Sequence, residues 1–144
     1  MIPKIIHYCW FGGNPLPKSA IECIESWKRF FPDYEIKEWN ESNYDVHKIP
    51  YIHEAYEAKK YAFVSDYARL CALKEYGGIY LDTDIEVIQS FDPLLHGYSA
   101  VFGFETEESV MTAFMAAQPA QPIICAFLDS YADKAFDAAE LEPN

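Results

Sequence analysis

Residues 76–84 read Tyr-Gly-Gly-Ile-Tyr-Leu-Asp-Thr-Asp, and this stretch decides the fold of the chain. A helical pattern over residues 62–76 ends at Gly77-Gly78, because glycine readily adopts the left-handed backbone that closes a helix. An apolar run follows at once and predicts a strand over Ile79–Val87. The two aspartates would then lie toward the carboxyl end of a strand, where open α/β sheets bind their ligands.

Side chains of a strand alternate between its two faces, so this run divides into two sets. One face would be acidic and the other apolar: Tyr80, Asp82, Asp84 and Glu86 against Ile79, Leu81, Ile85 and Val87. Strand positions two apart are separated by about 6.5–7 Å, so Asp82 and Asp84 can reach around one hydrated cation. Hard carboxylate oxygens suit Mn²⁺ or Mg²⁺, which is the cofactor we expect. The plainer alternative is an acidic sheet edge that needs no ligand.

The segments around this stretch alternate between strand and helix patterns. Strands are predicted at residues 4–11, 34–39, 79–87 and 100–104, and helices at 19–31, 50–60, 62–76 and 122–136. Such alternation predicts an α/β fold with a mostly parallel sheet flanked by helices. We expect one domain over residues 1–144. The ending lacks a cap and an apolar anchor, which favours the N-terminal part of a longer enzyme.

The first predicted helix has the clearest start and stop signals. Ser19 followed by Glu22 is typical of a capping box, and Pro32 ends the pattern. Apolar residues recur along one side at helical spacing: Ala20, Ile21, Ile24 and Trp27. We therefore expect Ser19 to cap a helix that carries one apolar stripe.

The chain is acidic, with 11 basic and 23 acidic side chains and a formal net charge of −12. This charge repels polyphosphates, so we expect no nucleic-acid partner, and any phosphate ligand needs a positioned cation or metal. The four cysteines are widely spaced, and no signal peptide or membrane span is visible. We expect buried, reduced thiols in a cytoplasmic protein without a transmembrane segment, which leaves peripheral association with a membrane open.

Polar side chains of the preceding helix can face the same ligand. Asp66 and Arg69 are three residues apart and share a helix face, with Ser65 beside them. A surface ion pair is the plainer interpretation and would contribute about 0.2–0.5 kcal/mol. The functional alternative is that Asp66 accepts hydrogen bonds from sugar hydroxyls while Arg69 donates to a hydroxyl or a phosphate.

We expect different roles for the aromatic and histidine side chains near the first strand. Trp10 precedes the glycines Gly12-Gly13, where its ring could stack on a nucleobase, and core packing is the rival interpretation. His7 is expected to be a hydrogen-bonded interior histidine. The remaining histidines show no metal-ligand spacing with one another and are assigned no role: His47, His53 and His96.

Three segments together resemble a known family. They are Ile6-His-Tyr-Cys-Trp-Phe-Gly-Gly13, Ser65-Asp-Tyr-Ala-Arg69 and Tyr76–Asp84, and they resemble glycosyltransferases whose sugar-binding region contains a DXD motif. Such enzymes include capsular-polysaccharide transferases, yeast outer-chain mannosyltransferases and, more distantly, the glucosylating domains of clostridial toxins. The resemblance covers about residues 3–105. It implies a GT-A-like fold, a nucleotide-sugar donor with uridine as the base, and transfer of a hexose with retention of anomeric configuration.

The resemblance also implies roles for residues at matching positions. These are Asp84 and Asp82 for the metal; Trp10, Asn40, Asn43, Ser65, Asp66, Arg69, Tyr80 and Asp82 for the donor; and Asp66, Arg69 and Asp82 for catalysis. Trp10 would stack on the base, Arg69 would stabilise the leaving diphosphate, and Asp84 would contact the metal directly. The implied acceptor is a glycan or a lipid-linked saccharide, as in the biosynthesis of a bacterial capsule.

Two other functions compete with this one. Haloacid-dehalogenase-like phosphatases also place a D-x-D pair after a strand, but they favour Thr or Val where Glu86 stands here, and their aspartates usually follow the first strand. The second alternative is a non-catalytic fragment that binds a nucleotide sugar, because such enzymes usually continue past the point where this chain stops. Donor turnover in the presence of manganese would separate that fragment from an active transferase.

Overall fold

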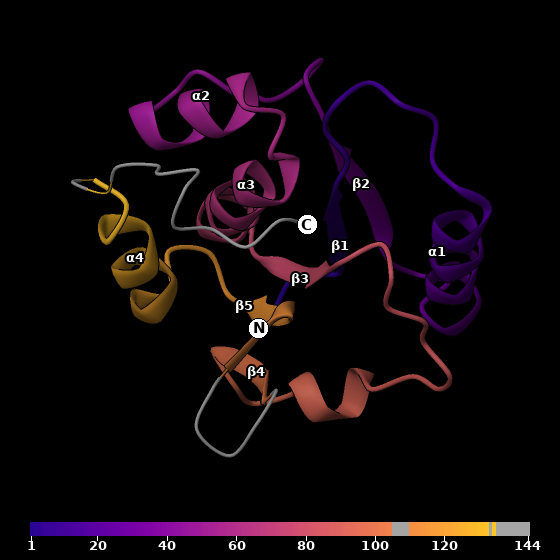
Figure 1. Cartoon of the computed structure of the whole chain (residues 1–144). Helices are drawn as coiled ribbons and strands as arrows, with labels where there is room; N and C mark the ends of the chain where they lie inside the picture. The colour runs from indigo at the N-terminus through magenta and orange to yellow at the C-terminus, as the bar shows by residue number, and fades with distance from the viewer. Residues whose placement is uncertain (105–109, 133, 135–144) are drawn as a thin grey trace.

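The computed structural model describes residues 1–104, 110–132 and 134, and it shows a twisted sheet with helices on both faces (Figure 1). The described elements, in chain order, are β1 (Ile5–Cys9), α1 (Lys18–Phe30), β2 (Glu35–Trp39), α2 (Pro50–Glu57), α3 (Tyr61–Glu75), β3 (Gly78–Leu81), the 3₁₀ helix η1 (Asp92–Leu95), β4 (Ala100–Phe104), β5 (Val110–Ala117) and α4 (Pro122–Asp129).

The described sheet has five strands in the order β2-β1-β3-β5-β4. β1 pairs in parallel with β2 and with β3, whereas β5 runs antiparallel to both β3 and β4. Four of these strands therefore point in one direction and β5 opposes them. The predicted α/β fold with a mostly parallel sheet flanked by helices is confirmed. Because β1 and β3 are parallel neighbours, their carboxyl ends meet at one edge of the sheet.

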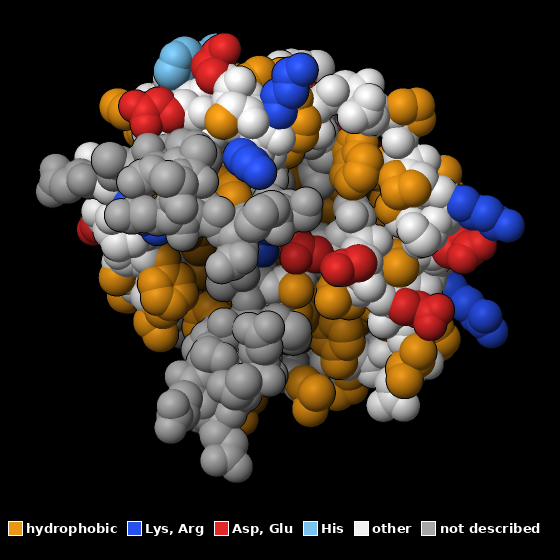
Figure 2. Space-filling model, in the orientation of Figure 1, with side chains coloured by type: hydrophobic (Ala, Val, Ile, Leu, Met, Phe, Trp, Pro, Cys, Tyr) orange, Lys and Arg blue, Asp and Glu red, His pale blue; other side chains and the backbone are white. Residues whose placement is uncertain are grey.

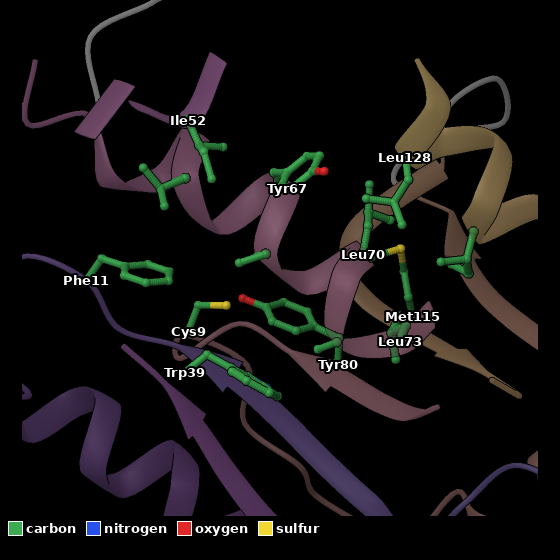
Figure 3. Packing of buried hydrophobic residues seen from close by; sticks show 14 of the residues in the cluster. Cys9, Phe11, Trp39, Ile52, Tyr67, Leu70, Leu73, Tyr80, Met115 and Leu128 are labelled. Carbon is green, nitrogen blue, oxygen red and sulfur yellow. The ribbon is translucent and has the colours of Figure 1, made fainter. Parts of the chain in front are cut away.

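Each face of the sheet packs against its own core, and the strands alternate between the two. In β3, Tyr80 enters the core beneath α2, α3 and α4, while Ile79 and Leu81 enter the core beneath α1 and η1. Figure 3 shows the first of these cores, with the Tyr80 hydroxyl directed toward Cys9. Burial on both faces explains why these strands are continuous apolar runs in the sequence.

The glycine pair after α3 is required by both backbone and space. Gly77 has a φ of +70°, and its amide donates to the carbonyl of Leu73 at 2.9 Å, so the predicted helix stop is confirmed. Gly78 has a φ of +116°, and a Cβ at this position would lie 2.5 Å from the carbonyl oxygen of Ile5. A side chain at Gly78 would therefore push β3 away from β1.

β3 is shorter than predicted and ends at Leu81. The Asp82 amide donates to the carbonyl of Ala113 at 3.0 Å, and the Asp82 carbonyl accepts from the Ile85 amide at 3.0 Å, which turns the chain. The predicted acidic strand face that continued through Asp84 and Glu86 is therefore wrong. The prediction that the aspartates follow the carboxyl end of a buried strand is confirmed.

Other boundaries also differ from the predicted ones. α1 begins at Lys18 after an extended Pro17, and no side chain caps it, so the capping box at Ser19 is wrong. Ile21 is 47% exposed and lies off the buried stripe of this helix. α4 ends at Asp129, where a turn begins, rather than continuing to residue 136; of the predicted extension, residues 133, 135 and 136 lie outside the described residues. β5 was not predicted.

The helices and the cysteines can be compared with what the sequence predicts. Over the residues that the structure describes, every helix is too short or too polar to cross a membrane. All four cysteines are free, but burial is confirmed for Cys9 alone. The thiols of Cys23, Cys71 and Cys125 are half-buried, which corrects the prediction of buried thiols at those positions.

Candidate functional site

A cavity of about 390 Å³ opens where β1 and β3 end and the first turns of α3 pass over the sheet. Its lining combines aromatic, hydroxyl and charged side chains: Cys9, Trp10, Phe11, Asn14, Tyr61, Ala62, Ser65, Arg69, Tyr80, Asp82, Thr83 and Asp84. Another hollow, of about 470 Å³, is lined almost wholly by apolar side chains such as Ile85 and Phe91. Polar groups converge in the first cavity, so we place the candidate site there.

Arg69 is the charged centre of this cavity. Its side chain is only 5% exposed, and its Nη2 lies 3.2 Å from Oδ1 of Asp66 and 3.2 Å from Oδ1 of Asp82. Its Nε donates to the carbonyl of Ser65 at 3.1 Å, and its guanidinium carbon lies 4.4 Å from the centre of the Tyr80 ring. The surface ion pair considered from the sequence is therefore a buried cation shared by two carboxylates. Removing such a cation typically costs about 3–5 kcal/mol, because it leaves charge uncompensated.

Tyr80 also holds the Asp82 side chain in place. The Tyr80 hydroxyl donates to Oδ1 of Asp82 at 2.9 Å, and burial raises the pKa of Tyr80 well above its ordinary value, so this hydroxyl stays a donor. Burial likewise raises the pKa of the neighbouring Cys9 to about 12, which keeps it a thiol. Among the described residues, both polar contacts of the Asp82 carboxylate, from Tyr80 and Arg69, fall on Oδ1. Oδ2 of Asp82 is thus left for another ligand.

Asp66 lies across Arg69 from this cavity. It lines a neighbouring hollow of about 270 Å³ together with Arg69, Leu70, Met115, Phe127, Ser130 and Tyr131. Burial raises the pKa of Asp66, and the adjacent Arg69 opposes that rise. Arg69 lines both hollows, so it is where a ligand in the first cavity comes nearest to Asp66 among the described lining residues.

The carboxylates at the cavity fit a hard divalent cation. Asp84 is exposed at the turn after β3, and Asp82 keeps one oxygen available, so both offer oxygen ligands at the same edge of the sheet. Oxygen donors of this type suit Mg²⁺ or Mn²⁺, which take carboxylates together with water and substrate phosphates. The donor set therefore agrees with the predicted cofactor.

Trp10 lines the cavity at the start of the loop after β1. Residues outside the cavity hold this loop in place. Nε1 of Trp10 donates to the carbonyl of Asn14 at 2.7 Å, which fixes the half-buried indole. The Gly12 amide donates to Oε2 of Glu41 at 2.6 Å, and the same oxygen accepts from the Tyr56 hydroxyl at 2.9 Å. These bonds anchor the loop after β1 to the loop after β2.

Asn40 and Asn43 lie outside the cavity lining. Oδ1 of Asn40 accepts from the Ser42 amide at 2.8 Å, and Oδ1 of Asn43 accepts from the Asn40 amide at 2.9 Å. Nδ2 of Asn43 donates to the carbonyl of Glu38 at 2.8 Å. Both side chains thus shape the turn after β2, and the structure does not bring them together with the other predicted site residues.

Several lining residues were missed by sequence reasoning. Tyr61 opens α3, and its carbonyl accepts from the Ser65 hydroxyl at 3.2 Å, so it lies one turn ahead of the predicted Ser65. That spacing of four could have revealed it. Asn14 carried no such signal, because it enters the cavity through the path of a loop.

The histidines behave in two ways. His7 is fully buried, its Nδ1 accepts from Nε1 of Trp39 at 3.1 Å, and its Nε2 lies 2.8 Å from the Gly77 carbonyl, so the predicted interior role is confirmed. His47 and His53 instead lie with their Nδ1 atoms 2.5 Å apart, near Glu57. The prediction that these two lack metal-ligand spacing is wrong, because the fold of a loop, not a sequence interval, brings them together.

Comparison with known proteins places this geometry in a family context. Residues 17–101 match the family model described as "Glycosyltransferase sugar-binding region containing DXD motif". The chain is similar to "Inositol phosphoceramide mannosyltransferase 3" of Schizosaccharomyces pombe, with 34% identity over 99 residues that make up 66% of this chain and 28% of that protein. It is also similar to "Mannosyl phosphorylinositol ceramide synthase SUR1" of Saccharomyces cerevisiae, with 29% identity over 90% of this chain and 35% of that one.

A solved structure extends the likeness to the fold. The "PaToxG Glycosyltransferase" structure superposes with a TM-score of 0.70 at 23% identity, over 89% of this chain and 58% of that chain. At that identity the match speaks for the fold, and it confirms the predicted resemblance to a glycosyltransferase α/β domain. In the two yeast comparisons the matched region is only 28% and 35% of the relative's length.

Proposed function

The chain belongs to the family of glycosyltransferases whose sugar-binding region contains a DXD motif, and on that premise we propose that its cavity binds a nucleotide-diphosphate sugar for transfer of the hexose. The observation that carries the proposal is the buried Arg69, which lines the cavity and is shared by Asp66 and Asp82. A cation fixed between carboxylates offers both donors and acceptors within a few ångströms. A polyhydroxylated ligand with a phosphate attached needs that mixture.

We assign the donor contacts by position. Ser65, Arg69 and Tyr80 line the cavity with Asp82, which can accept hydrogen bonds from sugar hydroxyls, and Asp66 does so at the boundary with the adjoining hollow. Trp10 lies in the loop after β1, where its half-buried indole can stack on the base of the donor. We propose that this base is uridine. The turn of Asn40 and Asn43 borders the anchored loop after β1, so we assign it at most an indirect contact with the nucleotide.

Asp84 and Asp82 would hold Mn²⁺ or Mg²⁺. When bound, such a cation offsets the negative charge of the diphosphate, which a chain with a net charge of −12 would otherwise repel. Arg69 serves the same end from the protein side. Its position is fixed by contacts with Ser65, Asp66 and Asp82, so it needs no reorganisation when charge develops on the leaving group.

We further propose transfer with retention of configuration, as the family resemblance implies. The bond from the anomeric carbon to the diphosphate oxygen breaks and a bond to the acceptor hydroxyl oxygen forms on the same face. The acceptor proton passes to the departing diphosphate. Arg69 acts by stabilising that departing group. The anomeric configuration of the product, read by NMR, tests this step, and an inverted product would exclude it.

The acceptor is proposed as a glycan or a lipid-linked saccharide. The yeast relatives carry names that refer to inositol phosphoceramide, which favours a lipid-linked acceptor over a capsular polysaccharide. Peripheral contact with a membrane from the cytoplasmic side would suit such an acceptor. Transfer assays with detergent-solubilised glycolipid and with soluble oligosaccharide acceptors would distinguish the two classes.

A non-catalytic donor-binding module is the second candidate. It is favoured by the assignments above, which give the cavity residues contacts with the donor and the metal and give none of them to the acceptor. A thermal-shift screen of UDP-glucose and GDP-mannose, each with and without Mn²⁺, tests donor binding for both candidates. Turnover of the stabilising donor then separates them: nucleotide release supports the transferase, and metal-dependent binding without release supports the module.

A further inference from the structure

A cluster outside the donor cavity has the composition of a metal site. His47, His53 and Glu57 each offer one ligand atom, these atoms all lie within 4.8 Å of one another, and all three residues are exposed. His53 and Glu57 are one turn apart on α2, so they project from the same face of that helix. His47 reaches them from the loop that precedes α2.

The protein positions the His47 ring before any ligand arrives. The His47 amide donates to Oδ1 of Asp45 at 2.9 Å, which holds the loop in a tight turn. The ring itself packs edge-on against Tyr56, with centroids 5.8 Å apart and an interplanar angle of 82°. On the helix, the amide of His53 donates to the carbonyl of Ile49 at 3.1 Å within the first turn of α2. The ligands are thus set by local backbone structure.

The two imidazoles meet nitrogen to nitrogen. Their Nδ1 atoms lie 2.5 Å apart, a contact in which two lone pairs repel unless a proton or a cation lies between them. A zinc ion bound at about 2.0–2.1 Å from each nitrogen would hold them about 3.3 Å apart in a tetrahedral arrangement. Both side chains are exposed and can separate by that amount through side-chain rotation.

We propose that His47, His53 and Glu57 form a second divalent-metal site, which takes a borderline transition metal of the zinc class. Two imidazole nitrogens and one carboxylate oxygen are a ligand set that zinc accepts, with a water in the fourth position. The set differs from the oxygen ligands of Asp82 and Asp84, which suit Mg²⁺ or Mn²⁺. The two sites should therefore select different ions.

The position of the cluster favours a structural role over a catalytic one. None of its three residues lines the donor cavity. Tyr56, which packs on the His47 ring, donates to Glu41, and Glu41 also accepts from the Gly12 amide. A metal here would fasten the loop after β2 to α2, next to the contacts that anchor the loop carrying Trp10.

Calorimetric titration of the full chain with Zn²⁺ tests this proposal, in an Asp84→Asn background that removes the acidic site. We expect one Zn²⁺ per chain, at least tenfold weaker binding in His53→Ala or His47→Ala, and weaker binding in Glu57→Gln. Glu54→Gln is the matched control, because Glu54 is an exposed glutamate on the same helix but outside the cluster. His96→Ala, at an exposed histidine directly after η1, is the second control.

Equal Zn²⁺ affinity in the cluster variants and the two controls would overturn the site. So would displacement of Zn²⁺ by equimolar Mg²⁺, since an imidazole site should reject that ion. Far-ultraviolet circular dichroism checks that each variant folds. Because all three residues are exposed, a variant that unfolds would contradict the placement of the cluster on the surface.

Discussion

At the residue scale, Arg69 is a planar donor with several fixed partners. Arg69→Lys keeps the charge but cannot contact Asp66, Asp82 and the Ser65 carbonyl at once. We expect donor affinity to fall about 10- to 100-fold and the free energy of unfolding to fall by about 1–3 kcal/mol. Arg29→Lys, at an exposed position of α1, is the matched control. Calorimetry and urea unfolding measure both quantities, and unchanged donor affinity in Arg69→Lys would remove Arg69 from the site.

Asp66 should recognise the sugar and not the nucleotide. It lies in the hollow beyond Arg69, so Asp66→Ala should weaken binding of the nucleotide sugar more than binding of the bare nucleoside diphosphate. We expect a loss of about tenfold for the sugar nucleotide, the value of one charge-assisted hydrogen bond. Competition binding of the two ligands measures the difference. Comparable losses for both would contradict the assigned role.

His7 makes the stability of the fold depend on pH. Burial lowers the pKa of His7 below its ordinary value of 6.5 and outweighs the opposing effect of the Gly77 carbonyl, so near this pH His7 binds a proton more readily in the unfolded chain than in the folded one. Stability is therefore complete above pH 6.5 and is lost as the pH falls below it, by at most about 1.4 kcal/mol per pH unit. His7→Gln should lose less stability between pH 7 and pH 5 in urea unfolding. An unchanged pH dependence would show that His7 is not the group responsible.

At the element scale, the junction between α3 and β3 sets the position of the aspartates. Gly78→Ala would place a Cβ 2.5 Å from the Ile5 carbonyl at a φ of +116°, so both a clash and backbone strain oppose it. Gly97→Ala is the matched control, because Gly97 has a φ of +82° with nothing within 4 Å of the added atom. We expect Gly78→Ala to destabilise the fold by about 1–3 kcal/mol more than the control. Thermal unfolding of the pair measures this, and equal losses would mean that β3 can move aside.

Elements with local signals could be predicted from the sequence, and elements held by distant contacts could not. The stop at Gly77 and the strands that became β1 and β3 followed from glycine and apolar runs. The end of β3 did not, because Asp82 leaves the strand through a bond between its amide and Ala113 of β5. β5 was not predicted, because its sequence Val-Met-Thr-Ala-Phe-Met-Ala-Ala is rich in alanine and methionine, which favour helices.

The same limit applies to the candidate site. The sequence predicted that Ser65, Arg69, Tyr80, Asp82 and Asp84 share one region, and all of them line one cavity. It could not show that Arg69 is buried between two carboxylates, or that Asp66 lies on its far side. Those facts depend on how α3 packs over β3. The amides of Asn40 and Asn43 are used by their own turn, a local competition that family resemblance cannot show.

At the scale of the whole molecule, charge governs how a diphosphate can bind. The chain carries a net charge of −12, and on the described part of the face in Figure 2 the basic side chains are scattered among acidic ones. Attraction of a diphosphate therefore has to be local. Arg69 supplies one positive charge at the cavity, and it is already shared by two carboxylates. Binding of a diphosphate in the cavity therefore requires a further positive charge, which we propose is a divalent cation held by Asp84 and Asp82.

The most direct test of the central claim is calorimetric binding of the stabilising nucleotide sugar to Asp84→Asn, with and without Mn²⁺. Glu86→Gln is the matched control, since Glu86 is exposed two residues further along the chain and outside the cavity lining. We expect Mn²⁺ to strengthen donor binding at least tenfold in the parent and in Glu86→Gln. We expect this gain to be lost in Asp84→Asn while the melting temperature without ligand is unchanged. An equal gain in Asp84→Asn and the parent would contradict the metal-assisted donor site.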